Sequence, residues 1–309
     1  MTSNVIKVLM HSCSEATQSQ YFSVYEKWVR FCEKNYKNPM DSNLNNVLEF
    51  LTNVFENNLS YSSVNTARSC LSLVLNTVDG FTVGNHPLVV RLLKGVARLR
   101  PPMPRYQTTW DTNTLLKMFD KWPKNENLSL SQLSYKLVSL LLLSTGQRVQ
   151  TIHSIKIDNI ILSSRVEILI PDRLKTSGLG RPQPTLILPY NELKSICVAS
   201  TLETYLYRTA EMRKSQSLFV SLCKPHRAVS KQTLSRWLVL VLKEAGINVN
   251  KYKSHSFRHC SVSKAFVKGI DIDTIYKCAG WSNSSRTFAR FYNRPFDNSE
   301  GYSNAVLSL

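Results

Sequence analysis

Apolar residues in the first hundred positions recur at the spacing of an amphipathic helix. In TQSQYFSVYEKWVRFCEKN, for example, Val24, Tyr25 and Trp28 fall on one helical face. The stripe of Val and Leu in NLNNVLEFLTNVFEN has the same period, and SYSSVNTARSC opens on serines that suit a helix N-cap. Four helices of a small bundle are therefore predicted, at 17–35, 43–57, 60–78 and 86–100.

A proline-rich basic stretch follows the predicted bundle. RLRPPMPRY has three prolines within four residues, which stop a helix and stiffen an extended connector. The pattern predicts a helical domain at 1–100, a linker at 101–106 and a larger domain at 107–309.

The larger domain has mostly helical periodicity with two strand-like segments. SLSQLSYKLVSLLLLSTGQRVQTIHSI (129–155) predicts a buried helix, a turn at Thr145-Gly146 and a second helix. RVEILIPDR (165–173) and PTLILP (184–189) are typical of strands, and the glycine-containing loop between them suits a hairpin. The predicted fold class is mainly α with a small antiparallel sheet. Further helices are predicted at 109–122, 190–213, 230–245, from 253 to Gly269, at 271–279, and after Gly280 through Tyr292.

The charge is strongly unbalanced, with 39 Lys and Arg against 21 Asp and Glu, a net charge of +18. Such an excess favours polyanions, and nucleic acid is the commonest such partner. A protein that is merely basic remains the alternative on this criterion. The seven cysteines are scattered without a CxxC pair, which predicts neither a zinc site nor a disulfide framework and fits a reducing intracellular compartment. No apolar run of about 18 residues predicts a membrane span, and the N-terminus is not typical of a secretory signal.

The stretch KSHSFRHCS brings three potential cations together without an acidic neighbour. On a helix, His255 and Arg258 share a face and His259 flanks it, so the negative partner is expected to come from outside the stretch. The chain offers related groups elsewhere: Arg148 after the Thr-Gly turn, Lys175 in the hairpin loop, and Trp281 and Tyr292 in GWSNSSRTFARFY.

These groups suit cleavage of a phosphodiester. Two guanidinium groups can hold the non-bridging oxygens and stabilise the pentacoordinate charge. An amine or imidazole can protonate the leaving 5′-hydroxyl, and a side-chain hydroxyl can attack the phosphorus. A tyrosine nucleophile would need no metal, cofactor or ATP, because the phosphotyrosyl bond keeps the energy for rejoining.

The order Arg, Lys, His-x-x-Arg, Trp, Tyr resembles that of the tyrosine recombinases, the phage-integrase-like enzymes. The resemblance spans nearly the whole chain, and the texture of TGQRVQTI and HSFRH is most similar to recombinases of eukaryotic mobile elements of the DIRS or crypton kind. It implies an N-terminal SAM-like core-binding domain and a mixed α+β catalytic domain.

The resemblance also implies roles for six residues. Arg148 and Arg258 would bind the scissile phosphate, Lys175 would act as general acid, and His255 would assist proton transfer. Trp281 would donate its indole N–H to phosphate and pack against the helix of the nucleophile, Tyr292.

Other residues near these motifs are assigned lesser roles. Tyr276 is better interpreted as a core residue, Tyr302 lies outside the helical pattern, and His259 is interpreted as structural or as a secondary phosphate contact. Two features depart from the family pattern. Relatives often have an acidic residue where this chain has Thr151. The tyrosine also lies eleven positions after Trp281 in this chain, whereas many relatives have a spacing of about nine.

The predicted function is a site-specific recombinase or integrase that acts through a 3′-phosphotyrosyl intermediate in mobile-element integration or excision. Implied partners are double-stranded DNA and, on that DNA, three further copies of the chain; no membrane partner is expected. An enzyme of a eukaryotic mobile element must reach chromosomal DNA, so the protein is expected inside the cell, in the nucleus. A type IB-like topoisomerase and a catalytically silent DNA-binding protein remain alternatives. Cations expected to contact DNA are Arg98, Arg100, Arg105, Arg173, Arg181, Lys231, Arg236, Lys251 and Lys253.

Overall fold

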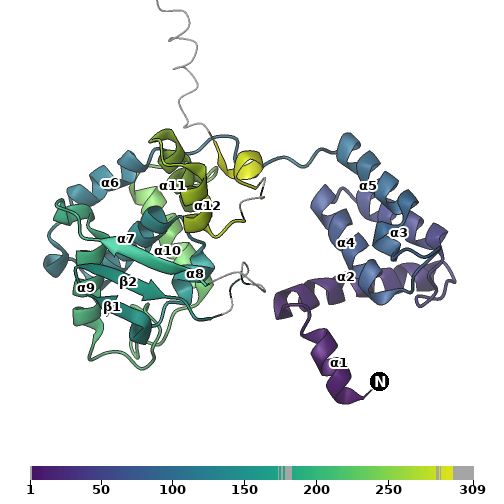
Figure 1. The fold of residues 1–309 in the computed structure, drawn as a ribbon, viewed down its shortest axis with the longest axis horizontal. Helices are drawn as coiled ribbons and strands as arrows, with labels where there is room; N and C mark the ends of the chain where they lie inside the picture. Colours follow the sequence, from purple (N-terminus) through teal and green to yellow (C-terminus); the bar gives the residue numbers. More distant parts are fainter. Residues whose placement is uncertain are drawn as a thin grey trace, which may run out of the picture. The chain divides into compact units, whose positions relative to one another are not determined.

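The computed structural model describes residues 2–172, 174, 177, 183–282, 285 and 287–294. It divides into two compact units, Met1–Met103 and Pro104–Leu309, which are described separately below as unit 1 and unit 2 (Figure 1). The division falls within the proline-rich stretch 101–106, where the sequence analysis placed its linker.

Unit 1 is a helical bundle. Its core is built from the predicted apolar stripes, with Trp28, Leu51, Val64 and Val89 all fully buried. Side chains cap four of the helices, since Ser14, Asn43, Ser60 and His86 accept hydrogen bonds from backbone N–H groups of the first turn. The helices are α1 (Ser3–Met10), α2 (Glu15–Lys34), α3 (Leu44–Glu56), α4 (Tyr61–Val74), η1 (Val83–Asn85) and α5 (Pro87–Leu99). The sequence analysis did not predict α1, and it extended α4 by four residues.

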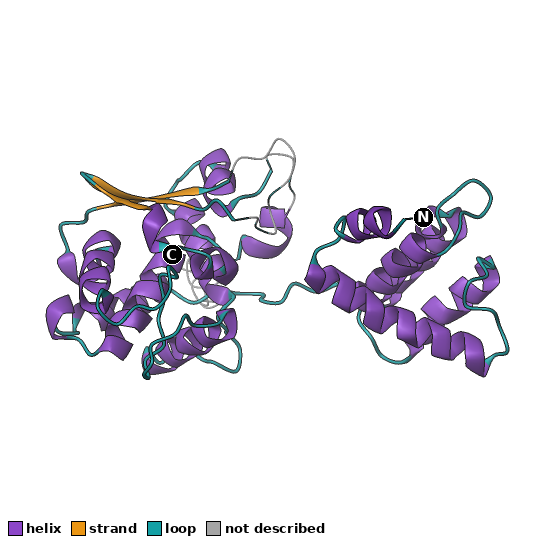
Figure 2. Ribbon diagram, turned by 90° about the horizontal axis from the view of Figure 1, so that it is seen from below, coloured by secondary structure: helices purple, strands orange, loops and turns teal. Residues whose placement is uncertain are grey.

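Unit 2 is mainly helical and has one small sheet (Figure 2). Its strands are β1 (Ile160–Leu162), β2 (Arg165–Leu169) and β3 (Thr185–Pro189). They pair antiparallel in the order β1-β2-β3, with Ile168 opposite both Ile160 and Leu186. The predicted hairpin is therefore β2–β3, and β1 is an additional edge strand. The helices are α6 (Thr112–Asp120), η2 (Asn125–Asn127), α7 (Leu130–Thr145), α8 (Val149–His153), η3 (Ile157–Asn159), η4 (Lys194–Ile196), α9 (Val198–Thr209), α10 (Lys231–Glu244), α11 (Ser256–Val267), α12 (Ile272–Ala279) and η5 (Phe288–Tyr292).

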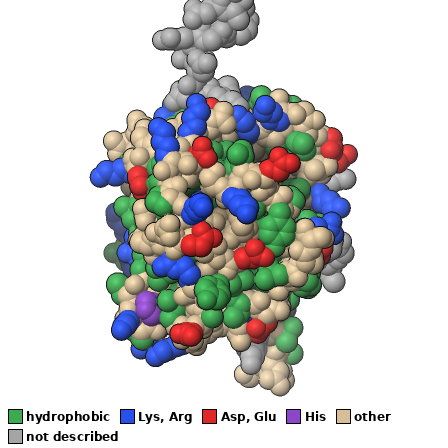
Figure 3. All heavy atoms as spheres, turned by 90° about the vertical axis from the view of Figure 1, so that its left-hand side faces the viewer, with side chains coloured by type: hydrophobic (Ala, Val, Ile, Leu, Met, Phe, Trp, Pro, Cys, Tyr) green, Lys and Arg blue, Asp and Glu red, His purple; other side chains and the backbone are tan. Residues whose placement is uncertain are grey.

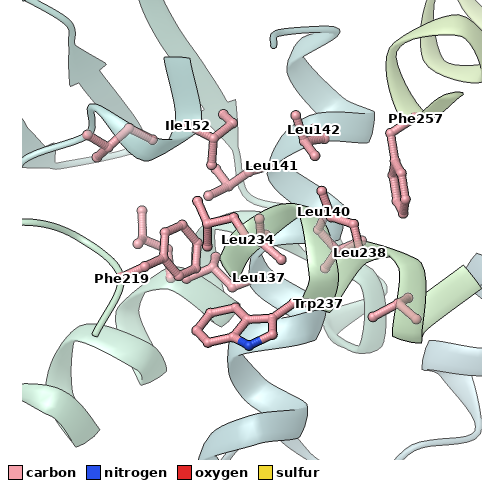
Figure 4. Close-up of a cluster of buried hydrophobic side chains, with 14 of the residues drawn as sticks. Leu137, Leu140, Leu141, Leu142, Ile152, Phe219, Leu234, Trp237, Leu238 and Phe257 are labelled. Carbon is pink, nitrogen blue, oxygen red and sulfur yellow. The ribbon is translucent and has the colours of Figure 1, made fainter. Parts of the chain in front are cut away.

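Helix α7 lies in the middle of the core of unit 2. Leu137 and Leu141 on this helix are completely buried, and Leu234, Trp237 and Leu238 of α10 pack in the same cluster (Figure 4). The sheet contacts α7 and α9 through β3. A helix apolar on all sides is typical of the centre of a core, so α7 provides a rigid base for the turn at its C-terminal end.

One predicted helix begins later than expected. The sequence analysis placed a helix at 190–213, whereas α9 starts at Val198, after η4. Between β3 and α9 the chain forms η4, and the thiol of Cys197 then caps α9 by accepting from the backbone N–H of Ser200.

The face of unit 2 drawn in Figure 3 carries both signs of charge among apolar side chains. The positive excess of the chain is therefore not concentrated on this face. No helix within the described ranges is long and apolar enough to cross a bilayer.

Candidate active site

The turn between α7 and α8 places the first predicted arginine. Gly146 ends α7 in the left-handed conformation, at φ +61°, and its N–H donates to the carbonyl of Leu142. Arg148 follows at the N-cap of α8 and is half-buried. Its guanidinium has no hydrogen bond to any described residue, so its donors remain available to an anion.

The N-terminal end of α11 carries the predicted His-x-x-Arg pair. His255 is the N-cap residue and is half-buried, whereas Arg258, one turn later, is only 1 % exposed. Arg258 donates from Nη1 to the carbonyl of Gly146, at 2.7 Å, and from Nη2 to the carbonyl of Ala279, at 2.8 Å. These bonds connect α11 with the ends of α7 and α12.

The predicted nucleophile lies on one turn of π-helix. The backbone N–H of Asn293 donates to the carbonyl of Phe288 five residues earlier, at 2.8 Å, the pattern that defines this wider turn. The sequence analysis expected an ordinary helix here. A π turn accommodates an extra residue and is frequent at functional sites. The buried hydroxyl of Ser263 on α11 anchors the turn by donating to the carbonyl of Tyr292, at 2.7 Å.

The phenol of Tyr292 meets the groups that the sequence analysis placed beside it. Its oxygen lies 3.1 Å from Nε2 of His255. The ring centroid is 5.3 Å from the guanidinium carbon of Arg258 and 4.8 Å from the ring of Trp281. Tyr292 itself is 8 % exposed, so the nucleophile and Arg258 are both covered in the free protein.

Trp281 packs as predicted but its predicted hydrogen-bond donor is not directed to solvent. The indole ring lies under the guanidinium of Arg258, at 4.4 Å, and next to Tyr276, which is buried as expected for a core residue. The indole N–H is buried without a partner among the described residues. A buried donor without a partner can be satisfied by an incoming ligand such as phosphate.

Burial lowers the pKa values of both arginines at the site, and a neighbouring positive charge adds to this effect at Arg258. Burial, followed by the charge of Arg148, lowers the pKa of Arg258 to about 9, while Tyr292 opposes the shift. Burial also lowers the pKa of Arg148. Both guanidinium groups are therefore cations at neutral pH whose hydration has been reduced, which strengthens their interaction with an anion.

The sequence analysis did not predict two of the packing contacts at the site. His259, which is 3 % exposed, stacks on the ring of Tyr292 with centroids 4.2 Å apart and 20° between the planes. Tyr106, at the end of the linker, meets His259 edge-on, at 4.9 Å. The motif indicates that His259 lies near the site, but no feature of the sequence marks Tyr106.

Thr151, in the position where relatives often have an acidic residue, takes part in a neutral hydrogen-bond chain. Its hydroxyl donates to Oε1 of Gln147 at 3.1 Å, and the amide of Gln147 donates to the carbonyl of Cys278. Both side chains are buried, at about 2 % exposure. The connection of α8 to α12 that a carboxylate could make is thus made by a threonine and a glutamine.

The remaining predicted residues divide into three groups. Lys175, Arg173 and Arg181 lie outside the described residues, as does Tyr302. Arg100 uses its guanidinium within unit 1, where it donates to the carbonyl of Phe55 in α3 and to that of Leu59 after the helix, and lies over the ring of Phe55. The other predicted DNA-contacting side chains are at least partly exposed: Arg98, Arg105, Lys231, Arg236, Lys251 and Lys253.

Groups of three or more His, Cys, Asp or Glu side chains that could hold a metal ion do not occur in the part of the chain that the structure describes. The site instead consists of cations around a tyrosine. A phenol beside a proton acceptor and guanidinium groups is suited to attack on a phosphodiester.

Comparisons with known proteins agree. The phage integrase family matches residues 110–299, and the chain belongs to this family. It is a site-specific tyrosine recombinase by family and fold. The DIRS or crypton affinity is not supported by these matches. No curated protein matches the sequence.

Solved recombinases share the fold at low sequence identity. The Tn1549 transposon integrase bound to transposon right end DNA is 16 % identical, with 98 % of each chain covered and a TM-score of 0.63. A lambda integrase dimer bound to a COC′ core site is 16 % identical, covering 93 % of this chain and 91 % of the other, with a TM-score of 0.58. The XerH recombinase in a post-cleavage complex is 20 % identical, with 84 % of this chain and 70 % of the other covered and a TM-score of 0.57.

Proposed function

We propose that this chain cuts a DNA strand with Tyr292, holds the 3′ end as a phosphotyrosyl ester and rejoins it to a new 5′-hydroxyl. The observation that carries this proposal is the 3.1 Å contact between the phenol oxygen of Tyr292 and Nε2 of His255, beside the guanidinium of Arg258. This contact gives the hydroxyl both a proton acceptor and a nearby cation.

In the cleavage step, the phenol oxygen of Tyr292 bonds to phosphorus and the bond from phosphorus to the 5′ oxygen breaks. The phenolic proton passes to His255, and Arg148 and Arg258 stabilise the charge on the non-bridging oxygens. Lys175 is proposed to protonate the departing 5′ oxygen, so that a free 5′-hydroxyl is released. Rejoining reverses each of these transfers, so the reaction balances without an added cofactor.

The covered state of the free protein implies a rearrangement when DNA binds. Tyr292 and Arg258 are nearly inaccessible, whereas Arg148 is half-buried and its donors have no partner among the described residues. We infer that Arg148 meets the phosphate first. The bound anion then attracts Arg258, and this movement exposes the phenol.

Double-stranded DNA and further copies of the chain are the proposed partners. The charge of +18 and the exposed cations of unit 2 support DNA binding. A lambda integrase with this fold was solved as a tetramer bound to a Holliday junction, which supports assembly of four copies on DNA. The last residues, SNAVLSL, lie outside the described residues; they are proposed to dock on a neighbouring copy.

Mobile-element integration or excision is the proposed process. The shared fold with a transposon integrase supports it, and the DIRS or crypton affinity rests on the sequence motifs alone. If the element is eukaryotic, the enzyme acts in the nucleus.

A covalent-adduct assay tests the proposed nucleophile. The protein is incubated with a nicked suicide duplex that carries the DNA flanking its gene, and a denaturing gel resolves protein joined to DNA. Wild type and Tyr276→Phe are expected to form the adduct, and Tyr292→Phe is expected to form none. Tyr276 is the matched control because it is buried in the same small apolar cluster. An adduct with Tyr292→Phe would show that another residue attacks, and DNA binding without an adduct in wild type would favour the silent DNA-binding alternative.

The type IB topoisomerase alternative has its own test, although the family match does not favour it. A topoisomerase relaxes supercoiled plasmid that lacks the flanking sequence, whereas a recombinase is expected to act only on plasmid that contains it.

A further inference from the structure

Four groups contact the phenol of Tyr292: His255, Trp281, His259 and the guanidinium of Arg258, which lies 5.3 Å from the ring centroid. The hydrogen bond to His255 fixes the oxygen but allows the ring to rotate about its long axis. Trp281 lies at 57° to the ring and bounds one side loosely. Among the rings that contact Tyr292, only His259 lies nearly parallel to it, at 20° and 4.2 Å, closer than the guanidinium of Arg258, and so it is the contact that best defines the plane of the phenol.

The ring of Tyr106 packs against His259 and restricts its movement. The two rings meet edge-on at 4.9 Å, and Tyr106 is 4 % exposed. Tyr106 is held in turn by the backbone N–H of Lys253, which donates to its hydroxyl at 3.4 Å, and by the ring of Tyr252. The end of the proline-rich linker is therefore packed, through one imidazole, against the nucleophile.

The surroundings of His259 keep its ring uncharged. It faces Tyr106 and Tyr292 and lies near four cationic or potentially cationic groups: His255, Arg294, Arg258 and Arg105. Burial, followed by these charges, lowers the pKa of His259 to about 3. Its Nδ1 is buried without a hydrogen-bond partner in the described part of the chain. An imidazole that is neutral, stacked and without a partner at Nδ1 serves as a flat surface rather than as an acid or base.

We propose that His259 is a positioning residue for cleavage, which sets the plane of the Tyr292 phenol, and that Tyr106 braces it from the end of the linker. The proposal rests on the proposed role of Tyr292 as nucleophile. In-line attack needs a lone pair of the phenol oxygen aligned with the bond that breaks, and the direction of that lone pair follows the plane of the ring. Loss of this near-attack geometry can slow such a reaction about 100-fold.

Two substitutions of His259 test whether the rate of cleavage depends on the flat shape of its ring or on its ring nitrogens. The readout is the single-turnover rate of adduct formation on the suicide duplex at saturating protein. His259→Phe keeps a flat ring without nitrogens and is expected to react within about threefold of wild type, with the same pH profile. His259→Ala removes the surface and is expected to react about 10- to 100-fold more slowly, with DNA affinity within about twofold of wild type.

Single substitutions of Tyr106 test whether its packing against His259 matters for cleavage, and they do not depend on whether His259→Ala folds well. Tyr106→Ala is expected to slow adduct formation far more than Tyr106→Phe, which keeps the ring and loses only the hydroxyl that accepts the long hydrogen bond from Lys253. Because both residues act on one surface, the double variant of His259→Ala and Tyr106→Ala should be no slower than the slower single variant.

Several outcomes would overturn the proposal. A loss of rate in His259→Phe equal to that in His259→Ala would mean that an imidazole nitrogen takes part in proton transfer. Multiplicative effects in the double variant would mean that Tyr106 does not act through His259. Unchanged rates in both alanine variants would remove the positioning role. Failure of wild type to form the adduct, or its formation by Tyr292→Phe, would instead refute the proposed nucleophile and is read separately on the same gel.

A substrate with sulfur in place of the 5′ bridging oxygen separates positioning from protonation. Sulfur leaves without an acid, so the defect of Lys175→Ala should be relieved. The defect of His259→Ala should persist, because it concerns the attacking group.

Discussion

Alanine at position 146 is expected to impair both stability and cleavage, for reasons that can be separated. Gly146 has φ +61°, a conformation that costs an L-residue about 1 kcal/mol. A Cβ built at this position lies 3.2 Å from Cγ1 of Val262, which is tighter than an ordinary contact. Val262 is buried on α11 and branched at Cβ, so relieving the contact costs about 1–2 kcal/mol more.

Gly246 is the matched control for the conformational part of this cost. It also follows a helix in the left-handed conformation, at φ +75°, but a Cβ there meets nothing within 4 Å. Gly246→Ala should therefore lose about 1 kcal/mol, and Gly146→Ala about 2–3 kcal/mol. In a unit of this size, 1 kcal/mol corresponds to about 2–4 °C in Tm, so thermal unfolding resolves the two.

Cleavage should distinguish the same two variants. The carbonyl of Gly146 accepts the 2.7 Å hydrogen bond from Arg258, so a shift of a few tenths of an ångström at this turn moves a group that is proposed to bind phosphate. We expect the adduct to form about tenfold more slowly in Gly146→Ala and at the wild-type rate in Gly246→Ala. Equal melting temperatures and equal cleavage rates for the two variants would refute this reasoning.

Three further predictions concern charge and hydrogen bonding. The pKa of His259 is lowered to about 3 in the folded protein, whereas in the unfolded chain it lies near the ordinary value of 6.5. Between these two values the unfolded chain therefore binds one more proton, so the free energy of unfolding falls as the pH drops through this window. From pH 7 to 5 this contributes a loss of about 2 kcal/mol, which denaturation of wild type against His259→Phe should show as a smaller acid sensitivity of the variant. Thr151→Val leaves Oε1 of Gln147 without its donor and should cost about 1–2 kcal/mol in urea unfolding, and an unchanged midpoint would contradict the hydrogen-bond chain. Lys253→Ala should reduce the slope of log Kd against log salt by about 1 in DNA titrations, and an unchanged slope would mean that Lys253 contacts no phosphate.

The helices were the most predictable part of the fold. Apolar stripes and serine caps in unit 1 placed four helices close to their observed bounds, because these signals are local. The edge strand β1 was missed because three residues are too few to show an alternating pattern. The π turn at Tyr292 was missed because its hydrogen bond depends on anchoring by Ser263 from another helix.

The candidate site was predictable as a set of residues but not as an arrangement. Motif order placed Arg148, His255, Arg258 and Tyr292 in one site, and the structure brings the last three into contact. The motif could not show that Arg258 is buried against two carbonyl groups, since these come from the ends of two other helices. The stacking of His259 depends on tertiary packing in the same way.

The charge arrangement explains why the site favours an anion. Neither Arg148 nor Arg258 forms an ion pair with a carboxylate among the described residues, and Arg258 has lost nearly all contact with water. A buried cation without a counterion is unfavourable, and the rings of Trp281 and Tyr292 compensate only in part. A phosphate that enters the site supplies the missing charge. The interactions that leave this cluster poorly neutralised in the free protein are thus the ones that favour an anion, and Tyr292 is the hydroxyl that this anion would meet.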